Sequence, residues 1–467
     1  MTHPPTRRRL ARTAAVLAAT AVAAVAAVAA PPAAEARPPK GDTARVSEGF
    51  KGEQPNGYSS ALGLSEDGRA ALFTSTATNL LPGPGTPNSD EVYVRDLRNG
   101  HLERISVADD GSRLDAPTTD AAISGDGRFV AFSTAATNVL PGQPKHAGDV
   151  FVRDRWTGRT ELVSAGTLPS TDDQSIRDAT SPSLSRDGRY VAYVSNRTDL
   201  APGVEHGRFN VYVTDRWTRT TRLVTVGANG EEAGNNSYRP TISADGSTIG
   251  FTSRAGNLLP PDPAGAADQG ADDTDGPALT GPRYYPYYVW TADTGRITVG
   301  SVDGTGARRG VGLAARISPD GRHAVYTLPV FGAGIPTSNH GIRLDVYVHE
   351  LATGRLTKVN TDLPGTTTKR SSGSAVMTAD SRWVYFESYA ETLVAGDTND
   401  SSDIFRRDLW TGRIERVSLT RAGGQGTADA RTPYVDATGG TVLFDAEDGD
   451  LVPGDTNAAT DVFRRRL

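Results

Sequence analysis

A short motif of the form Ser/Thr-x-Asp-Gly recurs at intervals of about 60 residues, and this repeat constrains the fold more than any other feature of the chain. The five clear copies begin at Ser65, Ser124, Ser185, Ser243 and Ser318. Two weaker copies, at Thr378 and Asp436, lie where the period places them. A chain of seven similar units must bury its apolar surface by packing each unit against the next.

Each unit has the sequence pattern of four antiparallel strands. The Asp-Gly turn leads into an alternating apolar run such as Phe129–Phe132, which has the two-residue period of a half-buried strand. A loop, a strand such as Asp149–Asp154, a Trp-Thr-Gly-Arg turn and a fourth strand such as Thr160–Ser164 follow. Asp-Gly between such strands predicts a hairpin with a type I′ turn, because Gly adopts positive φ without strain.

Seven four-stranded units predict an all-β fold, a seven-bladed β-propeller of antiparallel blades; a linear array of sandwiches is the alternative. The last unit runs through Asp461–Arg464 and reaches Leu467 without a fourth strand. The segment Ala44–Ser47 resembles the fourth strands at 103–106 and 415–418. We therefore expect the N-terminal strand to complete the last blade, which closes the ring and removes an exposed strand edge.

The repeat resembles a known family. The pattern Ser-x-Asp-Gly-Arg-x-x-Ala-Phe/Tyr, present at Ser124–Phe132 and Ser185–Tyr193, is similar to the WD40-like PD40 repeats of TolB-type propellers. The Pro that often precedes the Asp in that family is present only at Pro319, and the separate N-terminal domain of TolB is missing. The resemblance implies a propeller fold and a habit of binding partners, and propellers host many functions.

The first 36 residues read as a signal peptide. Arg7, Arg8, Arg9 and Arg12 precede an uncharged Ala/Val stretch, and Ala34-Glu35-Ala36 offers small residues for cleavage. Export could use the general secretory or the twin-arginine route, and a membrane anchor is the competing interpretation. The expected organisation is a signal peptide at 1–36 and a single propeller at 37–467, secreted and extracellular, with no membrane span after cleavage.

Composition narrows the partners. There is no cysteine, which excludes disulfides and thiolate metal sites. Without the four arginines and one glutamate of residues 1–36, the chain carries 45 basic and 54 acidic residues. An acidic surface repels phosphate backbones, so we expect no nucleic-acid partner. We expect a monomer.

Loop lengths indicate the working face. The Asp-Gly and Thr-Gly turns are tight, whereas the loops between second and third strands, such as 196–208, and the links between blades, such as 165–180, are long and share the opposite rim. An acidic insertion at 260–282 extends this rim, and Tyr284 and Tyr285 after it are candidates for an aromatic contact surface. Tyr287, Tyr288 and Trp290 fit third-strand packing positions better.

Two loops share the pattern Asp-x-Asn-x-x-x-Asp, at Asp397–Asp403 and Asp455–Asp461. This spacing could converge three oxygen ligands on Ca²⁺, although the Gly and distal Glu of an EF-hand are missing. Asp149 and Asp345 occupy the place of Asp403 without the upstream pair. A structural role, in which the Asp caps backbone N–H groups, is therefore favoured over a calcium site.

No local motif marks a catalytic centre, and we assign no catalytic, cofactor-binding or metal-binding residue. Arg153, Arg406 and Arg464 are taken to share one repeat position and to pair with acidic neighbours across the strand ladder. The expected function is non-enzymatic binding of a protein, peptide or glycan through the long-loop face. The alternative is a propeller enzyme, a hydrolase or lyase acting on extracellular glycans, with carboxylates supplied by different blades.

Overall fold

A computed structural model describes residue 1 and residues 41–467 except for 84–89, 144–145, 167–177, 261–283, 313, 332–341, 448 and 458. The regular secondary structure of the described chain is almost entirely β-strand, and its one helical element is a short turn, η1 (Phe50–Gly52). No helix within the described ranges is long and apolar enough to cross a membrane. The predicted signal peptide at 1–36 falls outside the described residues except for Met1.

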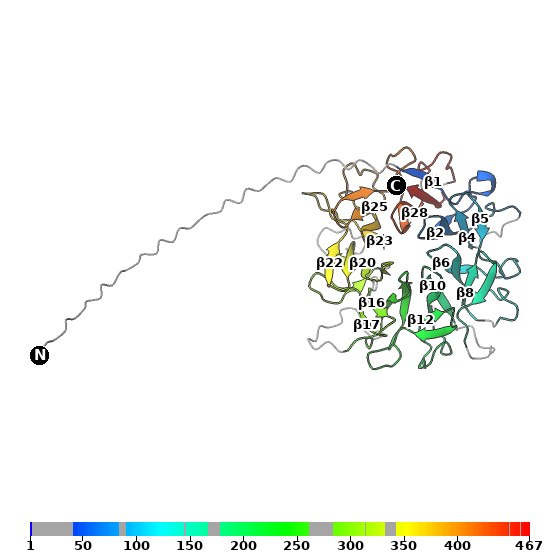
Figure 1. The fold of residues 1–467 in the computed structure, drawn as a ribbon. Helices are drawn as coiled ribbons and strands as arrows, with labels where there is room; N and C mark the ends of the chain where they lie inside the picture. Colours follow the sequence, from blue (N-terminus) through cyan, green and yellow to red (C-terminus); the bar gives the residue numbers. More distant parts are fainter. Residues whose placement is uncertain are drawn as a thin grey trace. The chain divides into compact units, whose positions relative to one another are not determined.

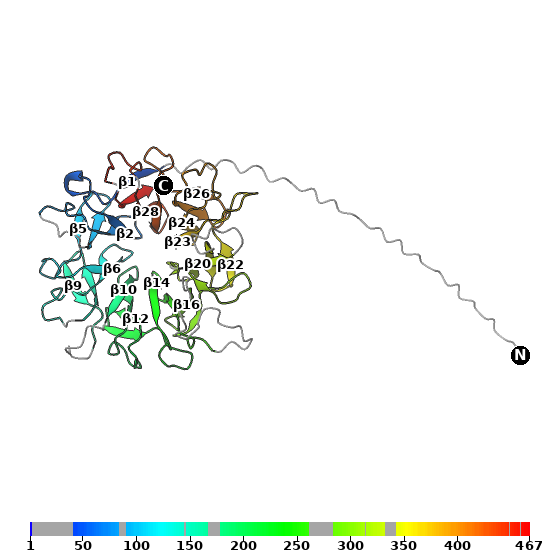
Figure 2. The ribbon, with the colours of Figure 1, turned by 180° about the vertical axis from the view of Figure 1, so that it is seen from behind.

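The strands form seven blades around a central axis (Figures 1 and 2). Blade 1 consists of β2 (Ser59–Leu64), β3 (Ala70–Ser75), β4 (Glu91–Asp96) and β5 (Leu102–Arg104). Blade 2 consists of β6 (Thr118–Ile123), β7 (Phe129–Thr134), β8 (Asp149–Asp154) and β9 (Arg159–Leu162). Blade 3 consists of β10 (Ala179–Leu184), β11 (Tyr190–Ser195), β12 (Asn210–Asp215) and β13 (Thr220–Leu223). Blade 4 consists of β14 (Ser237–Ile242), β15 (Thr248–Ser253), β16 (Tyr285–Thr291), β17 (Ile297–Val299), with β18 (Gly310–Val311) added to β16.

Blades 5 and 6 consist of β19 (Arg316–Ile317), β20 (His323–Phe331), β21 (Ile342–Glu350), β22 (Arg355–Lys358); and β23 (Ser372–Met377), β24 (Trp383–Ser388), β25 (Asp403–Asp408), β26 (Ile414–Arg416). Blade 7 consists of β27 (Ala430–Val435), β28 (Thr441–Ala446), β29 (Asp461–Arg466) and β1 (Asp42–Arg45). The predicted all-β, seven-bladed propeller is confirmed, and units 6 and 7, whose turn motifs depart most from the repeat, keep four regular strands.

The N-terminal strand closes the ring as predicted. β1 pairs antiparallel with β29, with Asp42 opposite Arg466 and Arg45 opposite Phe463. The backbone N–H of Val46 continues the ladder by donating to the carbonyl of Val462, at 2.6 Å. Closure leaves no blade with a missing outer strand, which removes a template for edge-to-edge association.

The Ser-x-Asp-Gly motif forms a tight turn, but not the predicted type I′ turn. In blade 1, Gly68 (φ +67°) is the one residue of the turn with positive φ, and its N–H donates to the carbonyl of Ser65. This geometry is a type I turn followed by a left-handed Gly. The side chains explain the difference, because Asp67 Oδ1 accepts from both Ser65 Oγ and Arg69 N, and Ser65 Oγ accepts from Ala70 N.

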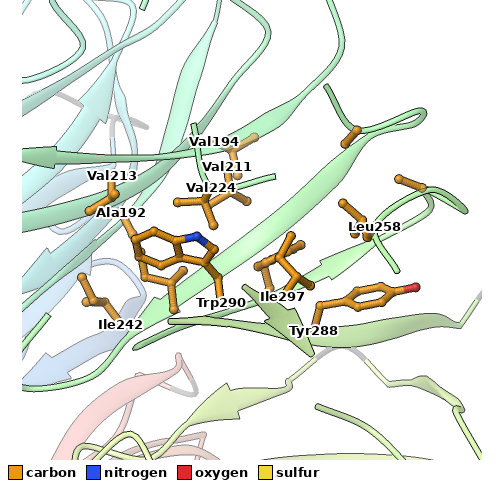
Figure 3. Packing of buried hydrophobic residues seen from close by; sticks show 14 residues of the cluster. Ala192, Val194, Val211, Val213, Val224, Ile242, Leu258, Tyr288, Trp290 and Ile297 are labelled. Atoms are coloured by element: carbon orange, nitrogen blue, oxygen red, sulfur yellow. The ribbon is translucent and has the colours of Figure 1, made fainter. Parts of the chain in front are cut away.

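The core lies between neighbouring blades. Second strands are buried on both faces rather than half-buried as predicted: Ala71, Leu72 and Phe73 are all fully buried, because each blade packs between two others. Figure 3 shows the cluster between blades 3 and 4, where Trp290 lies among Val213, Ala192 and other side chains of blade 3. As predicted, Tyr287, Tyr288 and Trp290 are buried packing residues; Tyr288 and Trp290 belong to this cluster, and Tyr287 belongs to the cluster between blades 4 and 5.

The strand register corrects the alignment of the third-strand arginines. Arg153 shares its position with Arg407 and Arg465, whereas Arg406 and Arg464 lie one residue earlier. Arg406 Nε donates to Glu415 Oε2 at 2.7 Å, and Arg464 Nη2 lies 3.9 Å from Asp42 Oδ2, so acid pairing holds for these two. It is wrong for Arg153, whose guanidinium donates to Thr160 Oγ1 instead.

Candidate functional site: a pocket at the junction of blades 3, 4 and 5

The two faces of the ring differ as the loop lengths predicted. On one face the Ser-x-Asp-Gly turns of successive blades contact one another: Glu66 N donates to the carbonyl of Gly125, and Arg186 N to that of Ala244. Nearby, the guanidinium of Arg316 in blade 5 lies 5.2 Å from the ring centroid of Tyr434 in blade 7. These contacts join the turns and inner strands of different blades at the tight-turn face, whereas the other face carries the long loops.

A pocket of about 330 Å³ lies on the long-loop side of blades 3, 4 and 5. Its lining comes from the ends of strands that point to this face: the starts of β10, β14 and β16 and the ends of β11 and β15. Val311 and Gly312, at the end of β18, bring the lining to blade 5, where Gly312 N donates to the carbonyl of Thr327 in β20. Three aromatic residues contribute, Phe209, Tyr238 and Tyr285. Hydroxyl groups come from Thr180, Ser181 and Thr252, and charged groups from Asp178 and Arg239. Such a mixture of flat apolar surface and a few polar groups is typical of ligand sites.

The pocket exists because two side chains are short. In blade 7, Asp445 at the fifth position of β28 reaches the inner strand of blade 1, where its Oδ1 accepts from Ala61 N at 2.6 Å. In blade 6, Glu387 at the same position of β24 accepts from Thr432 N of blade 7 at 3.0 Å. In blades 3 and 4 this position holds Val194 and Thr252, and both line the pocket. The space that an acidic side chain fills in blades 6 and 7 is therefore left open here; blades 1, 2 and 5 also carry a short side chain at this position, namely Thr74, Ser133 and Thr327.

The inner strands beside the pocket carry strained bulges. Register shifts fall between Thr180 and Ser183 in β10 and between Tyr238 and Thr241 in β14. Within them Ser181 has φ +53° and Arg239 has φ +54°. Left-handed backbone is unfavourable for residues with a Cβ, and such residues and bulges concentrate at functional sites.

Polar contacts order the pocket wall. Thr180 Oγ1 donates to Asp120 Oδ2 of blade 2 at 2.8 Å, and the Ser181 hydroxyl lies 3.4 Å from the same oxygen. The rings of Phe209 and Tyr238 lie 6.1 Å apart, and the guanidinium of Arg254 lies 5.4 Å from the Tyr285 ring centroid. These contacts hold the aromatic surfaces in place before a ligand arrives.

Asp178 is the carboxyl group in the pocket with a perturbed pKa. Burial raises its pKa above the ordinary value, and the neighbouring carboxylates Asp149 and Asp120 raise it further, against the lowering effect of the Ala179 N–H. Carboxyl groups of this kind are found at both binding and catalytic sites, as well as in structural networks.

Of the two tyrosines predicted as an aromatic contact surface, Tyr284 and Tyr285, only one lines the pocket. Tyr285, at the start of β16, lines the pocket and pairs with Val311 of β18. Tyr284 precedes it without lining the pocket, and burial raises its pKa. The acidic insertion at 260–282 lies, except for Pro260, outside the described residues.

The Asp-x-Asn loops are bridged by arginine. Arg416 Nη2 lies 3.1 Å from Asp397 Oδ1 and its Nε lies 3.3 Å from Asp403 Oδ2. Arg45 joins Asp455 and Asp461 in the same way, at 3.0 and 3.3 Å. Burial raises the pKa of Asp403 and of Asp461 to about 6 in spite of these cations. In both loops a guanidinium bridges the two aspartates, which supports a structural role.

The structural role differs from backbone capping. Asp149 Oδ1 accepts from Ser164 Oγ at 2.7 Å, and that hydroxyl in turn accepts from Val150 N at 3.0 Å. Asp345 accepts in the same way from the side-chain amide of Asn360. The carboxylate therefore acts on the backbone through a second side chain. Across the described part of the chain, no group of three or more His, Cys, Asp or Glu side chains is arranged to hold a metal ion.

No family model matches the sequence, and no curated protein matches it either. Among solved structures, an oligogalacturonate lyase from Vibrio parahaemolyticus is similar, with 11% identity, coverage of 92% of this chain and 97% of that chain, and a TM-score of 0.51. A prolyl endopeptidase is similar over 91% of this chain and 51% of that chain, with 13% identity and a TM-score of 0.50. At such identities the similarity shows the fold alone.

A putative TolB from Agrobacterium tumefaciens is also similar, with 15% identity, coverage of 65% of this chain and 80% of that chain, and a TM-score of 0.37. The ring of seven four-stranded blades agrees with the resemblance to TolB-type propellers that the repeat predicted. In fold, the chain is thus a seven-bladed β-propeller, with a pocket on its long-loop side.

Proposed function

We propose that this protein is a secreted, non-enzymatic propeller that binds a glycan fragment in the pocket at the junction of blades 3, 4 and 5. The observation that carries the proposal is the lining, which combines the rings of Phe209, Tyr238 and Tyr285 with several hydroxyl groups and one carboxyl group. A sugar ring presents C–H groups to flat aromatic surfaces and hydroxyls to polar side chains, so this mixture suits it. The volume of about 330 Å³ suits one or two sugar units rather than a folded protein surface.

Secretion rests on the leader-like residues 1–36. N-terminal sequencing of the protein recovered from culture medium tests it, with cleavage after Ala36 as the expected result. Recovery of an uncleaved chain from the cell fraction alone would contradict it.

Thermal unfolding of the protein with a panel of neutral and acidic oligosaccharides tests the binding function. A ligand at a hundred times its Kd adds about 2.7 kcal/mol to the free energy of unfolding, which is measurable as a rise in Tm. Tyr238→Ala is expected to remove the rise. Trp156→Ala is the matched control, because Trp156 is 71% exposed on a tight turn of the opposite face. A rise that survives Tyr238→Ala would place binding elsewhere.

A second candidate function is cleavage of the bound glycan, favoured by one observation: Asp178 lines the pocket with a raised pKa. Burial that raises the pKa of a carboxyl group favours its protonated form, which is the form that a general acid needs. Chromatography of a bound oligosaccharide after long incubation decides between the candidates. Products that vanish in Asp178→Asn would establish an enzyme, and an intact oligosaccharide supports binding alone.

A further inference from the structure

On the tight-turn face, the gaps between the first three blades are filled by an arginine and a glutamate. Arg155 of blade 2 donates to Glu103 of blade 1 at 3.0 Å. Arg216 of blade 3 forms the same ion pair with Glu161 of blade 2. Both arginines also donate to the carbonyl of a turn glycine, Gly127 or Gly188, at 2.5 Å.

The gap between blades 2 and 3 shows how an arginine head group fits there. The Arg216 guanidinium lies 4.3 Å from the ring centroid of Phe129, whose ring also contacts Arg128 at 4.7 Å. The arginine therefore stacks on an aromatic face, bonds a glycine carbonyl and pairs with a carboxylate. Guanidinium groups favour this combination of stacking and directed hydrogen bonds.

Between blades 3 and 4 both partners are replaced. Ala292 stands where blades 2 and 3 have Arg155 and Arg216, and Arg222 stands where blades 1 and 2 have Glu103 and Glu161. Four other blades carry a leucine at the position of Ala292, packed against their cores: Leu97, Leu351, Leu409 and Leu467. A pocket of about 290 Å³, lined by Ala292 and Arg222, lies in this gap. Trp290 and Val213, labelled in Figure 3, line its floor.

Two of the three groups that received the arginine, the aromatic ring and the turn carbonyl, are still present, whereas the carboxylate is replaced by Arg222. Tyr190 replaces Phe129, and Gly246 replaces Gly188; both line the pocket. A Cβ on Gly246 would meet the Tyr190 ring at 2.2 Å, and one on Gly188 would meet the Phe129 ring at 2.4 Å, so the ring and turn are placed alike in the two gaps. Arg189 lies 4.8 Å from the Tyr190 ring centroid, in the place of Arg128. In the described part of the chain, no cation stacks on Tyr190 in the way that Arg216 stacks on Phe129, and the Gly246 carbonyl has no hydrogen-bond partner.

Arg222 adds a cation at the edge of the same pocket. Its guanidinium lies 5.4 Å from the ring centroid of Trp290, and among the described residues it forms no ion pair. Asp215 and Asp245 also line the pocket; Asp215 is paired with Arg189, and Asp245 Oδ1 accepts from Ser243 and Ser247. The pocket thus combines two groups that could hold a guanidinium, the Tyr190 ring and the Gly246 carbonyl, which together we call the cradle, with the cation Arg222, which lacks an anionic partner among the described residues.

We infer that this pocket binds an arginine residue with a free α-carboxylate, either free arginine or the C-terminal arginine of a peptide. The ligand guanidinium stacks on Tyr190 and donates to the Gly246 carbonyl, as Arg216 does in the neighbouring gap. The ligand carboxylate pairs with Arg222. This second site is independent of the glycan pocket and lies on the opposite face of the ring.

Isothermal titration of the full chain with L-arginine tests the inference, with two analogues as controls. Citrulline keeps the carboxylate and replaces the guanidinium by a neutral urea, and agmatine keeps the guanidinium without the carboxylate. Each is expected to bind roughly tenfold or more weakly than arginine, because each loses a charge-assisted hydrogen bond. Citrulline binding as tightly as arginine, or no arginine binding at about 10 mM, would overturn the inference.

Two variants locate the site. Ala292→Arg fills the cradle from within, and it is expected to abolish arginine binding while raising Tm, which also shows that the variant folds. Arg222→Gln is expected to weaken arginine binding to the level of agmatine and to leave agmatine unchanged. Arginine binding that is unaffected by Ala292→Arg would contradict the assignment.

Discussion

The inner edges of blades 6 and 7 and of blades 3 and 4 use one strand position in opposite ways. In blades 6 and 7, Glu387 and Asp445 extend to the bulged inner strand of the next blade and accept a backbone N–H. In blades 3 and 4, Val194 and Thr252 leave that space open, and it forms part of the pocket. A propeller can therefore either fill or leave open the space beside a bulged inner strand by the length of one side chain, without any added motif.

On the tight-turn face, too, one short side chain leaves a pocket. There Ala292 replaces the arginine or leucine of the other blades, and a second pocket results. Here the departure from the repeat carries the information, because a position filled in the other six blades shows what shape and chemistry the empty one accepts.

The largest expected effect concerns the filled edge, that is, the edge of blade 7 where Asp445 contacts blade 1. At pH 5.5, Asp445→Ala is expected to lower the free energy of unfolding by about 2–4 kcal/mol, because it leaves the buried Ala61 N–H without an acceptor and opens a cavity. Thr252→Ala, at the same position of the open edge, is expected to lose less than about 1 kcal/mol. Urea unfolding measures both, and equal losses would remove the distinction between the two edges.

The second prediction is the pH dependence that Asp445 gives to the edge of blade 7. Burial raises the pKa of Asp445 to about 7, above the value of an unfolded aspartate. The folded state then binds the extra proton, so the contribution of this group to stability falls as pH rises from about 4 to about 7 and is constant above.

Asp445→Asn removes that titration while keeping an oxygen acceptor for Ala61 N–H. Its stability relative to wild type is expected to improve by about 2 kcal/mol between pH 5.5 and pH 8. Urea unfolding at the two pH values measures the change, and Asp403 and Asp461 titrate in both proteins and cancel. A constant difference across this range would show that Asp445 is ionised throughout.

The smallest effect concerns the bulges that both edges share. Ser374 in β23 has φ +39°, a conformation that Gly adopts freely. Ser374→Gly is expected to raise the free energy of unfolding by about 0.5–1 kcal/mol. Ala375→Gly, next to it at ordinary φ, is expected to lower it by a similar amount. If both variants lose stability, the left-handed residue is held without strain.

Much of the fold could be predicted from sequence because its signals are local. The spacing of the Ser-x-Asp-Gly turns sets the number of blades, and Ala44–Ser47 identifies the closing strand. The errors arose where the answer depends on side-chain contacts. Hydrogen bonds of Asp67 and Ser65 hold the turn in type I geometry. Each of the pairs Arg406-Arg407 and Arg464-Arg465 can be aligned with Arg153 in two ways, and only the strand register shows that Arg407 and Arg465 are the equivalent residues.

The pocket could not be predicted because three blades build it. Phe209, Tyr238 and Tyr285 are widely separated in sequence, and their approach depends on the bulges in β10 and β14 and on the short inner strands β18 and β19. One signal was available: aligning the second strands places Val194 and Thr252 opposite Glu387 and Asp445. Its meaning depends on knowing that those acids reach the next blade.

Val194→Glu tests most directly whether the space left open beside the short side chain of Val194 is the glycan-binding site. By analogy with Glu387 and Thr432, the new carboxylate is placed to accept from Arg239 N and to fill the pocket. The measurement is the Tm of wild type and variant with and without the oligosaccharide that stabilises wild type. The account predicts a folded variant whose Tm does not respond to the sugar, and an equal rise in both proteins would contradict it.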